Sequence, residues 1–395
     1  MLQQLTNHSP DLQKLVAEGY ELGLSKSHNH LLVKGVPYVN AKKEVAIGTL
    51  VCKLNVAGNQ TAQPGDHVAY FIGEYPCRED GTEVTGMKNS SPPADLDTGL
   101  HIDHTFSAKP TTPYPDFYAK VTTYIAKISG PVQFIDPAAT ACNFNVIEDA
   151  GDDSVFHYID TASSRAQISA LNEKFEAQKV AIVGVGGTGS YVLDFVAKTW
   201  VKEIHLFDAD VFSQHNAFRC PGAASVEDLK AKPSKVEYMA SMYAKLRRGV
   251  VPHPEPVTEA NVDQLREMSF VFVCIDSGKA KLPIIEKLEA WGISFVDVGM
   301  GIELVDGALT GIVRLTTSTP AMRDHVRTKD RILFNDPVEG NEYATNIQVI
   351  ELNALNAALA VIKWKKISGF YADLEREHFM AYALNGNSIL NEDQS

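Results

Sequence analysis

A glycine-rich turn near the middle of the chain constrains the fold more than any other sequence feature. Four apolar residues, 180–183, lead into Gly184, Gly186, Gly187 and Gly189, and apolar residues at helical spacing follow. This order predicts a buried strand, a tight turn and a helix, which together open a βαβ unit. The backbone N–H groups of such a turn, and the N-terminus of the next helix, face a phosphate. The chain is therefore expected to build an α/β sheet with a nucleotide site.

Charged and amide side chains follow the turn in an order that narrows the choice of nucleotide. Asp208 ends the next expected strand, about twenty residues beyond the glycines, where a ribose hydroxyl binds in such units. Further along the chain come Asp210, Asn216, Arg219, Lys235 and Asp276. A dinucleotide needs few cations, because backbone amides hold most of its pyrophosphate. Cleavage of a triphosphate needs more positive charge, because the leaving group is more highly charged. Arginine, lysine and a carboxylate-bound Mg²⁺ can supply it.

In these elements the chain resembles the ThiF/MoeB/E1 superfamily of ATP-dependent adenylating enzymes, which activate the C-terminal carboxylates of ubiquitin-like proteins. The matching elements are a Gly-x-Gly-Gly-x-Gly turn, an Asp-x-Asp, an Asn-x-x-Arg, a later Lys and a Cys-x-Asp, over roughly residues 165–300. The resemblance implies a Rossmann-like, mostly parallel sheet beside a smaller α+β N-terminal domain. It also implies ATP and Mg²⁺ as cofactors and a ubiquitin-like protein of a bacterial conjugation pathway as substrate.

The resemblance assigns a role to each candidate residue. The four glycines would form the turn over the nucleotide, and Asp208 would bind the ribose with Asp210 beside it. Asn216 and Arg219 would bind the phosphates, Lys235 the leaving phosphates, and Asp276 the Mg²⁺. Arg165, on a helix expected to run through Phe175, looks like the family's arginine that reaches the γ-phosphate in the neighbouring protomer. That role implies a homodimer.

The same residues also have purely structural interpretations. Gly187 can permit close packing of helix and strand, Lys235 can lie in a solvated helix start, and Asp276 can cap the helix after it. Each functional role alone is about as probable as its structural alternative. As an ordered set, these residues favour the functional interpretation.

The cysteines depart from the family pattern. The chain has five, none beyond Cys274, and no Cys-x-x-Cys pair. The zinc site of many prokaryotic members is therefore absent, and the usual nucleophilic cysteine is missing from its usual place. Three routes stay open: transfer of the acyl-adenylate to another protein such as an E2-like acceptor, attack by a hydroxyl of residues 316–319 with His325 as base, or attack by Cys220. For Thr319 a helix N-cap before Pro320 is the favoured interpretation.

Composition excludes several classes of partner. The formal net charge is −13, from 36 basic and 49 acidic residues, without a basic stripe, which argues against binding nucleic acid. No apolar run is long enough to span a membrane, and the first residues show no secretion signal. An odd, scattered cysteine set fits a reducing compartment. We therefore expect a cytoplasmic protein with no membrane partner.

The chain is expected to divide into two domains at an acidic, glycine-containing break, residues 148–153. Residues 1–155 would form the α+β domain, which we expect to dock the protein substrate or the next carrier. Residues 156–395 would form the adenylation domain, with a C-terminal helical segment for dimerisation. Local patterns predict a helix at 11–22, strands at 30–39, 67–73 and 308–315, an exposed loop at 77–115, a helix or strand at 120–128, a helix at 346–364 and a disordered tail at 391–395.

Three alternative functions remain beside adenylation of a ubiquitin-like protein. The chain can be a MoeB/ThiF-like activator of a sulfur carrier, although the missing cysteines weaken that interpretation. It can be an NAD-dependent Rossmann oxidoreductase, with Asn216, Arg219, Lys235 and Asp276 incidental. It can also be a scaffold that binds a nucleotide without chemistry.

Overall fold

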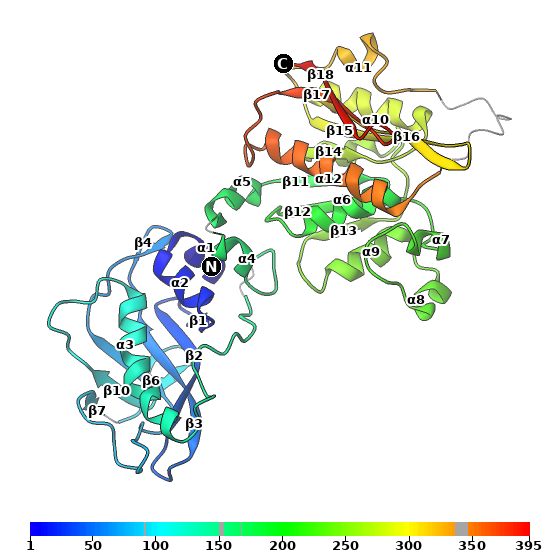
Figure 1. Ribbon diagram of the computed structural model, residues 1–395. Helices are drawn as coiled ribbons and strands as arrows, with labels where there is room; N and C mark the ends of the chain where they lie inside the picture. The colour runs from blue at the N-terminus through cyan, green and yellow to red at the C-terminus, as the bar shows by residue number, and fades with distance from the viewer. Residues whose placement is uncertain (91, 150–153, 167, 336–346) are drawn as a thin grey trace. The chain divides into compact units, whose positions relative to one another are not determined.

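The computed structural model describes the chain except for residues 91, 150–153, 167 and 336–346 (Figure 1). The chain forms two compact units, Met1–Ala170 and Leu171–Ser395. Most of the acidic break predicted at 148–153, and the first residue of the helix predicted at 346–364, lie outside the described residues. Within the described part of the chain, no helix combines the length and apolar character needed to cross a membrane.

The first unit is built on an antiparallel sheet with the strand order β1-β2-β3-β6-β10-β7. These strands are β1 (Glu21–Leu24), β2 (His30–Val39), β3 (Val45–Lys53), β6 (Val68–Ile72), β7 (Lys88–Ser90) and β10 (His104–Ser107). Two short ribbons accompany them, β4 (Val56–Ala57) with β5 (Gln60–Thr61), and β8 (Ala94–Asp97) with β9 (Leu100–Ile102). The helices are α1 (Leu2–His8), α2 (Pro10–Ala17), α3 (Phe117–Ser129) and α4 (Thr161–Arg165), and a 3-10 helix, η1, spans Gly130–Phe134.

The core of the first unit lies between this sheet and α3. Asp116 caps α3 by accepting a hydrogen bond from the Ala119 backbone N–H, and Phe117 and Tyr124 then point into the core. They pack with Phe71 and Phe106 of the sheet, whose rings stack 5.7 Å apart. Residues 120–128, for which the sequence predicts either a helix or a strand, are therefore part of helix α3.

Three other expectations for the first unit fare differently. The strands predicted at 30–39 and 67–73 are confirmed as β2 and β6. The helix predicted at 11–22 ends at Ala17, because Gly19 takes a φ of +96°, and β1 follows. The loop predicted at 77–115 is wrong in part, since β7 to β10 lie within it.

The second unit holds an eight-stranded mixed sheet in the order β13-β12-β11-β14-β15-β16-β17-β18. Its strands are β11 (Lys179–Val183), β12 (Glu203–Phe207), β13 (Val250–His253), β14 (Phe270–Val273), β15 (Ser294–Val305), β16 (Ala308–Ser318), β17 (Glu377–Ala383) and β18 (Ser388–Gln394). The pairs from β13 to β15 are parallel and those from β15 to β18 antiparallel. This confirms the expected Rossmann-like, mostly parallel fold beside a smaller α+β domain.

Helices cover both faces of the parallel part (Figure 1). The helices described after the first unit are α5 (Glu173–Glu176), α6 (Gly187–Ala197), α7 (Gln214–Ala217), α8 (Val226–Ala231), α9 (Lys235–Tyr243), α10 (Gly278–Trp291), α11 (His325–Thr328) and α12 (Ile350–Ile367), with 3-10 helices η2 (Ser169–Asn172) and η3 (Val262–Leu265). On one face α10 packs on Ala181, Val183 and Val271. On the other, Trp364 of α12 contacts Phe272, with ring centroids 6.1 Å apart. Because successive strand residues point to opposite faces, the central strands β11 and β14 are apolar apart from Lys179 at the start of β11.

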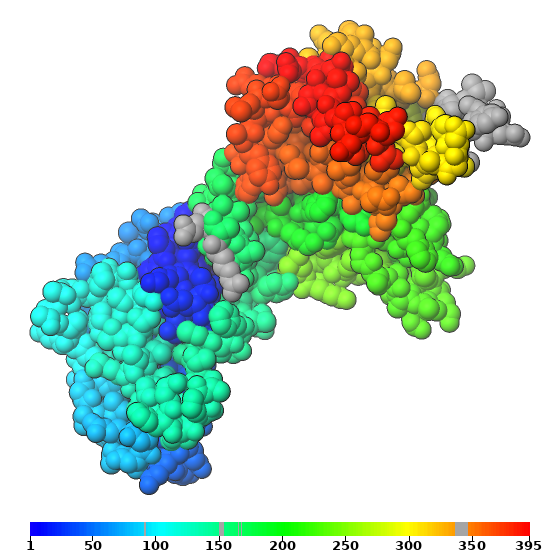
Figure 2. Space-filling view, in the orientation of Figure 1, coloured from blue at the N-terminus to red at the C-terminus, as the bar shows by residue number. Residues whose placement is uncertain are grey.

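Three predictions for residues 156–395 are wrong. The helix expected from Arg165 through Phe175 is broken into α4, η2 and α5. Thr319 does not cap a helix, because it pairs with Met322 in a tight turn before α11. The tail expected to be disordered forms β18, which pairs with β17 on the surface of this unit (Figure 2, red).

Candidate functional site

The glycine turn lies at the carboxyl end of β11, between the neighbouring strands β12 and β14. The chain leaves β11 toward β12 and later crosses back to β14, so this is the switch point where open α/β sheets bind ligands. Gly184 has a φ of +91°, and a Cβ atom there would lie 2.7 Å from the carbonyl oxygen of Cys274. A Cβ on Gly189 would lie 1.9 Å from the carbonyl oxygen of Gly184. Both positions therefore require glycine.

The other two glycines face different surroundings. A Cβ on Gly186 would meet no atom within 4 Å, so the backbone there is open to a ligand. Gly186 is also the N-cap of α6, and no side chain caps the helix. A Cβ on Gly187 would lie 2.3 Å from the side-chain nitrogen of Asn353 in α12. This glycine permits close packing of two helices, whereas the structural interpretation from the sequence was packing of a helix on a strand.

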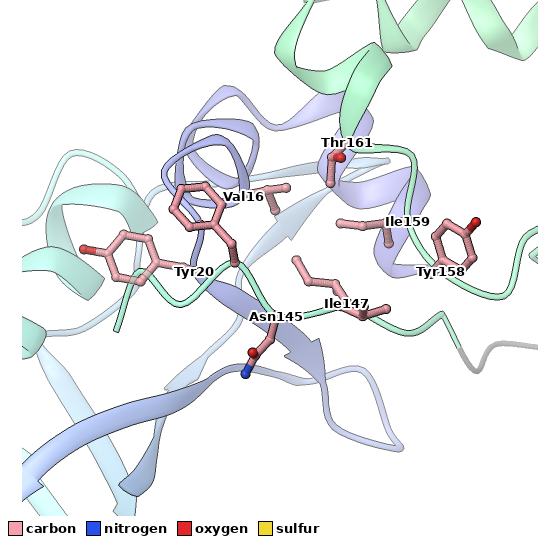
Figure 3. Close-up of a pocket in the computed structure, with 10 residues that line it drawn as sticks. Val16, Tyr20, Asn145, Ile147, Tyr158, Ile159 and Thr161 are labelled. Atoms are coloured by element: carbon pink, nitrogen blue, oxygen red, sulfur yellow. The ribbon is translucent and has the colours of Figure 1, made fainter. Parts of the chain in front are cut away.

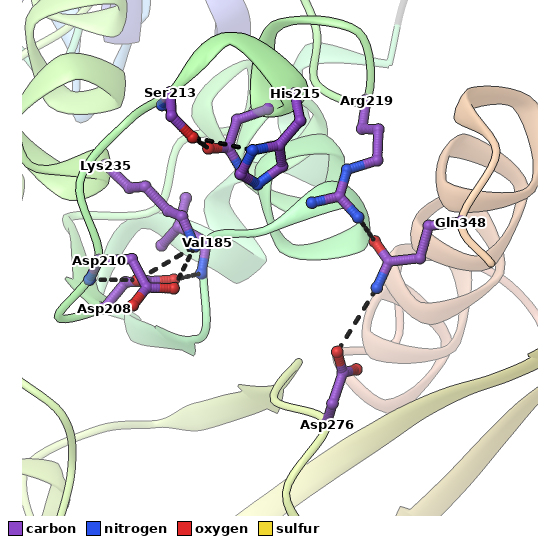
Figure 4. Close-up of polar contacts among 10 residues, drawn as sticks. Val185, Asp208, Asp210, Ser213, His215, Arg219, Lys235, Asp276 and Gln348 are labelled. Carbon is purple, nitrogen blue, oxygen red and sulfur yellow. Dashed lines mark hydrogen bonds and ion pairs between the residues drawn. The ribbon is translucent and has the colours of Figure 1, made fainter. Parts of the chain in front are cut away.

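Asp208 fixes the turn from the neighbouring strand. Its Oδ2 accepts a hydrogen bond of 2.8 Å from the Val185 backbone N–H, and its Oδ1 accepts one from the Asp210 backbone N–H (Figure 4). Lys235, the first residue of α9, places Nζ 2.6 Å from Asp210 Oδ2 and 3.5 Å from Asp208 Oδ1. The lysine expected at the leaving phosphates thus lies against the two candidate ribose-binding carboxylates.

Asn216 has a capping role in this structure. Its Oδ1 accepts hydrogen bonds from the backbone N–H and the hydroxyl of Ser213, which form the capping box of α7. The side chain is buried. The loop that carries Arg219 toward the switch point is therefore held by the same asparagine that the sequence predicted to bind phosphate.

Arg219 and Asp276 are brought together by a residue from the far end of the chain. Gln348, just before α12, accepts a hydrogen bond of 3.0 Å from Arg219 Nη1 through Oε1. Its Nε2 lies 3.5 Å from Asp276 Oδ2 (Figure 4). A guanidinium and an exposed carboxylate thus face each other across one amide group, beside the open glycine turn. Their opposite charges suit a phosphate on one side and a cation on the other.

The carboxylate of Asp276 suits Mg²⁺, which binds one or two carboxylates together with water and phosphate oxygens. The described residues contain no group of three His, Cys, Asp or Glu side chains that could enclose a metal ion. An exposed carboxylate at the end of β14 is the donor set expected where a nucleotide supplies the remaining oxygens. The residues present therefore fit a magnesium ion carried in with a nucleotide.

A wider cavity of about 800 Å³ adjoins Asp276. Its wall includes Lys281, Arg314, Met300 and Phe334, so it combines two cations with apolar surface. Beneath it, Lys281 Nζ lies 2.7 Å from Asp297 Oδ1. Burial raises the pKa of Asp297 above its usual range.

Of the acyl acceptors that the sequence predicts within the chain, Cys220 and the first three residues of 316–319 are poorly suited as nucleophiles. Burial raises the pKa of the Cys220 thiol, which disfavours the reactive thiolate. Burial also raises the pKa of Cys274. The side chains of Thr316, Thr317 and Ser318 are buried in β16. The remaining hydroxyl, of Thr319, lies 3.1 Å from Nε2 of His378 rather than beside the predicted base His325.

Arg165 ends α4 in the first compact unit, whereas the other candidate residues lie in the second. Its role at the γ-phosphate of a partner stays a prediction.

Sequence reasoning missed Gln348 and Asn353. Gln348 had no local signal. Asn353 and Asn356 are three residues apart on the buried face of α12, among Leu352, Ala357 and Ala360, and that pattern was a usable signal.

Comparison with known protein families assigns both parts of the chain. The ThiF family matches residues 160–363, which is more than half of the sequence. The chain belongs to the ThiF family. A domain of unknown function, DUF6791, matches residues 10–161. The family indicates an enzyme of the ATP-dependent adenylyltransferase type, preceded by a separate domain.

Solved structures with similar folds include MccB and PaaA. E. coli MccB is 17% identical, with 73% of this chain and 83% of that chain covered and a TM-score of 0.46. A structure of E. coli MccB with ATP is 18% identical to this chain. The match covers 58% of this chain and 67% of that chain, with a TM-score of 0.44. PaaA is 16% identical to this chain. The match covers 59% of this chain and 69% of that chain, with a TM-score of 0.44. No curated protein matches the chain.

Proposed function

We propose that this chain adenylates the C-terminal carboxylate of a ubiquitin-like protein, with ATP as the co-substrate. The observation that carries the proposal is the placement of Arg219 and Asp276 on opposite sides of Gln348, next to the glycine turn. Membership of the ThiF family supports adenylation over the NAD-dependent alternative. A carboxylate that attacks ATP must approach a polyanion, and these side chains would offset that charge.

The chemical step is a displacement at phosphorus. An oxygen of the substrate carboxylate bonds to the α-phosphorus of ATP, the bond to the bridging oxygen of the β-phosphate breaks, and pyrophosphate leaves. Arg219 would stabilise the charge on the phosphates, and Asp208 would orient the ribose. Asp276 would hold Mg²⁺, which supplies positive charge at the leaving pyrophosphate. Asn216 would act by holding the Arg219 loop in place.

The acyl-adenylate would leave the active site without forming an enzyme ester. The raised pKa of the Cys220 and Cys274 thiols and the burial of the Thr316, Thr317 and Ser318 hydroxyls support this, because none of these five groups presents an activated nucleophile. The acceptor would then be a separate protein of E2-like function. Arg165 would act in a homodimer, reaching the nucleotide of the partner subunit.

The N-terminal unit would dock the ubiquitin-like substrate. Its surface carries a cavity of about 330 Å³ lined by Val16, Tyr20, Ile147 and Ile159 (Figure 3). Val146, at its rim, is 69% exposed. Val146→Asp should weaken binding of the substrate protein while leaving ATP affinity unchanged. If the wild type and Val146→Asp bind the substrate protein equally tightly, the cavity does not dock it.

ATP–pyrophosphate exchange tests the main proposal. We expect exchange only with a ubiquitin-like protein whose C-terminal carboxylate is free, and none with its C-terminal amide. Arg219→Ala and Asp276→Ala should each reduce the exchange rate on the order of 10²–10³-fold. The exposed Arg266→Ala and Asp263→Ala are matched controls that remove the same charges elsewhere.

The same assay separates the alternatives. Tight ATP binding without exchange by any candidate would favour a nucleotide-binding scaffold. A thermal shift with NAD and none with ATP·Mg²⁺ would contradict the proposal and favour an oxidoreductase. Exchange that persists at wild-type rate in Asp276→Ala would remove that residue from the mechanism.

A further inference from the structure

Asn353 is a buried amide beside the glycine turn. It lies in the first turn of α12 and is 1% exposed. Its Oδ1 accepts a hydrogen bond of 3.0 Å from the Thr188 hydroxyl, which fixes the plane of the amide. Its Nδ2 has no hydrogen-bond partner among the described residues. The amide oxygen therefore has a hydrogen-bond partner among the described residues, and the amide nitrogen has none.

An unpartnered buried donor is unusual enough to need an explanation. Folded proteins pair nearly all buried polar groups, because a donor that loses water without gaining an acceptor destabilises the fold. Packing alone does not require an amide here. A leucine has the same number and branching of side-chain heavy atoms and could cover Gly187 without leaving a donor unpaired. The polar group is thus explained best by a ligand that supplies the acceptor.

The surroundings indicate the chemistry of that ligand. Asn353 lines a cavity of about 60 Å³ together with Gly186, Gly187 and Thr188, the first residues of α6. The first N–H groups of a helix have no partners within it, and no side chain caps this one. The amide and the helix N-terminus therefore present donors to one space, and such a space favours an anion with several acceptor oxygens.

We propose that Asn353 Nδ2 donates a hydrogen bond to a phosphate oxygen of the nucleotide bound at the N-terminus of α6. This inference rests on the proposed function for its ligand, and it adds a phosphate-binding residue from α12 to those that follow the sheet strands. Thr188 acts as a positioning residue, because its hydroxyl holds the amide oxygen and so directs the amide nitrogen.

Two substitutions test the hydrogen bond. Asn353→Asp keeps the size and the acceptor for Thr188 but replaces the donor by an oxygen. Asn353→Leu removes the donor without adding charge. We expect the Kd for ATP, measured by isothermal titration calorimetry, to rise about 10-fold in Asn353→Leu and about 100-fold in Asn353→Asp. Asn385→Asp, the same chemical change in the exposed turn between β17 and β18, is the matched control and should leave the Kd unchanged.

A ligand series separates phosphate binding from a structural role. The ratio of variant to wild-type Kd should be large for ATP, ADP and AMP, and close to one for adenosine. An equal ratio for all four ligands would overturn the inference, since a distorted site weakens every ligand. Unchanged ATP affinity in both variants, beside a wild type that binds ATP, would overturn it as well. A wild type that binds no nucleotide would instead overturn the proposed function and this inference with it.

Discussion

Lys281 Nζ lies 2.7 Å from Asp297 Oδ1, and both side chains are almost completely buried. One comes from the first turn of α10 and the other from β15, so the pair joins a helix to the sheet under the cavity beside Asp276. A buried pair is costly to break from one side, because the remaining charge has neither water nor a partner.

We therefore expect Lys281→Met to lower the free energy of unfolding by about 3–5 kcal/mol in urea denaturation. The double variant Lys281→Met with Asp297→Leu should recover much of that loss, since it leaves no unpaired charge. Equal losses in the single and double variants would show that the pair contributes through packing rather than charge.

Gly184 and Gly186 should respond differently to the same substitution. Gly184→Ala forces a Cβ against the Cys274 carbonyl at a positive φ, and we expect it to cost about 3 kcal/mol of stability. Gly186→Ala meets open space, so its effect on stability should stay below about 1 kcal/mol. Its Cβ would occupy room needed by the nucleotide, so ATP affinity should fall. A Gly186→Ala protein with normal ATP affinity would place the nucleotide elsewhere.

Stability should decrease as the pH falls from about 7.5 to about 5.5. Burial lowers the pKa of five histidines below the usual value of 6.5; they are His30, His104, His253, His325 and His378. The unfolded chain then binds more protons than the folded chain in this window, so acid favours unfolding.

Protonation of Asp297 has the opposite effect on stability. Its pKa is raised in the folded chain, so acid favours the folded state at this residue. The test is the free energy of unfolding across the window in wild type and in His325→Gln. The variant should show a smaller loss on acidification; a wild type that gains stability toward acid would contradict the argument.

Arg247 holds a turn together through backbone oxygens. It is 1% exposed, and its guanidinium donates to the carbonyls of Thr199, Val201 and Lys202, between α6 and β12. Arg247→Met leaves these oxygens without donors and should cost about 3 kcal/mol by thermal or urea denaturation. The exposed Arg266→Met is the matched control and should change stability by less than about 0.5 kcal/mol.

The parts of the site that the sequence predicted are those set by local rules. Gly184 directly follows β11 and Asp276 lies three residues after β14. Parallel strands bring their carboxyl ends to one edge, so the proximity of these residues could be inferred from spacing. The sequence could not predict where the Lys235 side chain points, because that depends on the distance from α9 to Asp208 and Asp210. The sequence predicts Asn216 as a phosphate ligand, and the use of its oxygen in the capping box of α7 could not be predicted from spacing alone.

The residues missed by the sequence come from the far end of the chain. Gln348 and Asn353 reach the turn because α12 packs on α6, and no local pattern states which helix covers which face. The strand β18 was missed for a related reason. Most of its residues are polar and exposed, so only pairing with β17 makes them a strand.

The contact between Thr188 and Asn353 spans 165 residues of sequence. During synthesis the glycine turn therefore leaves the ribosome before its covering helix exists, by roughly 10–30 s at ordinary elongation rates. Through that interval the β11–α6 segment carries uncovered apolar surface. On the proposed role of Asn353, the nascent chain also lacks this phosphate donor until residue 353 has been made.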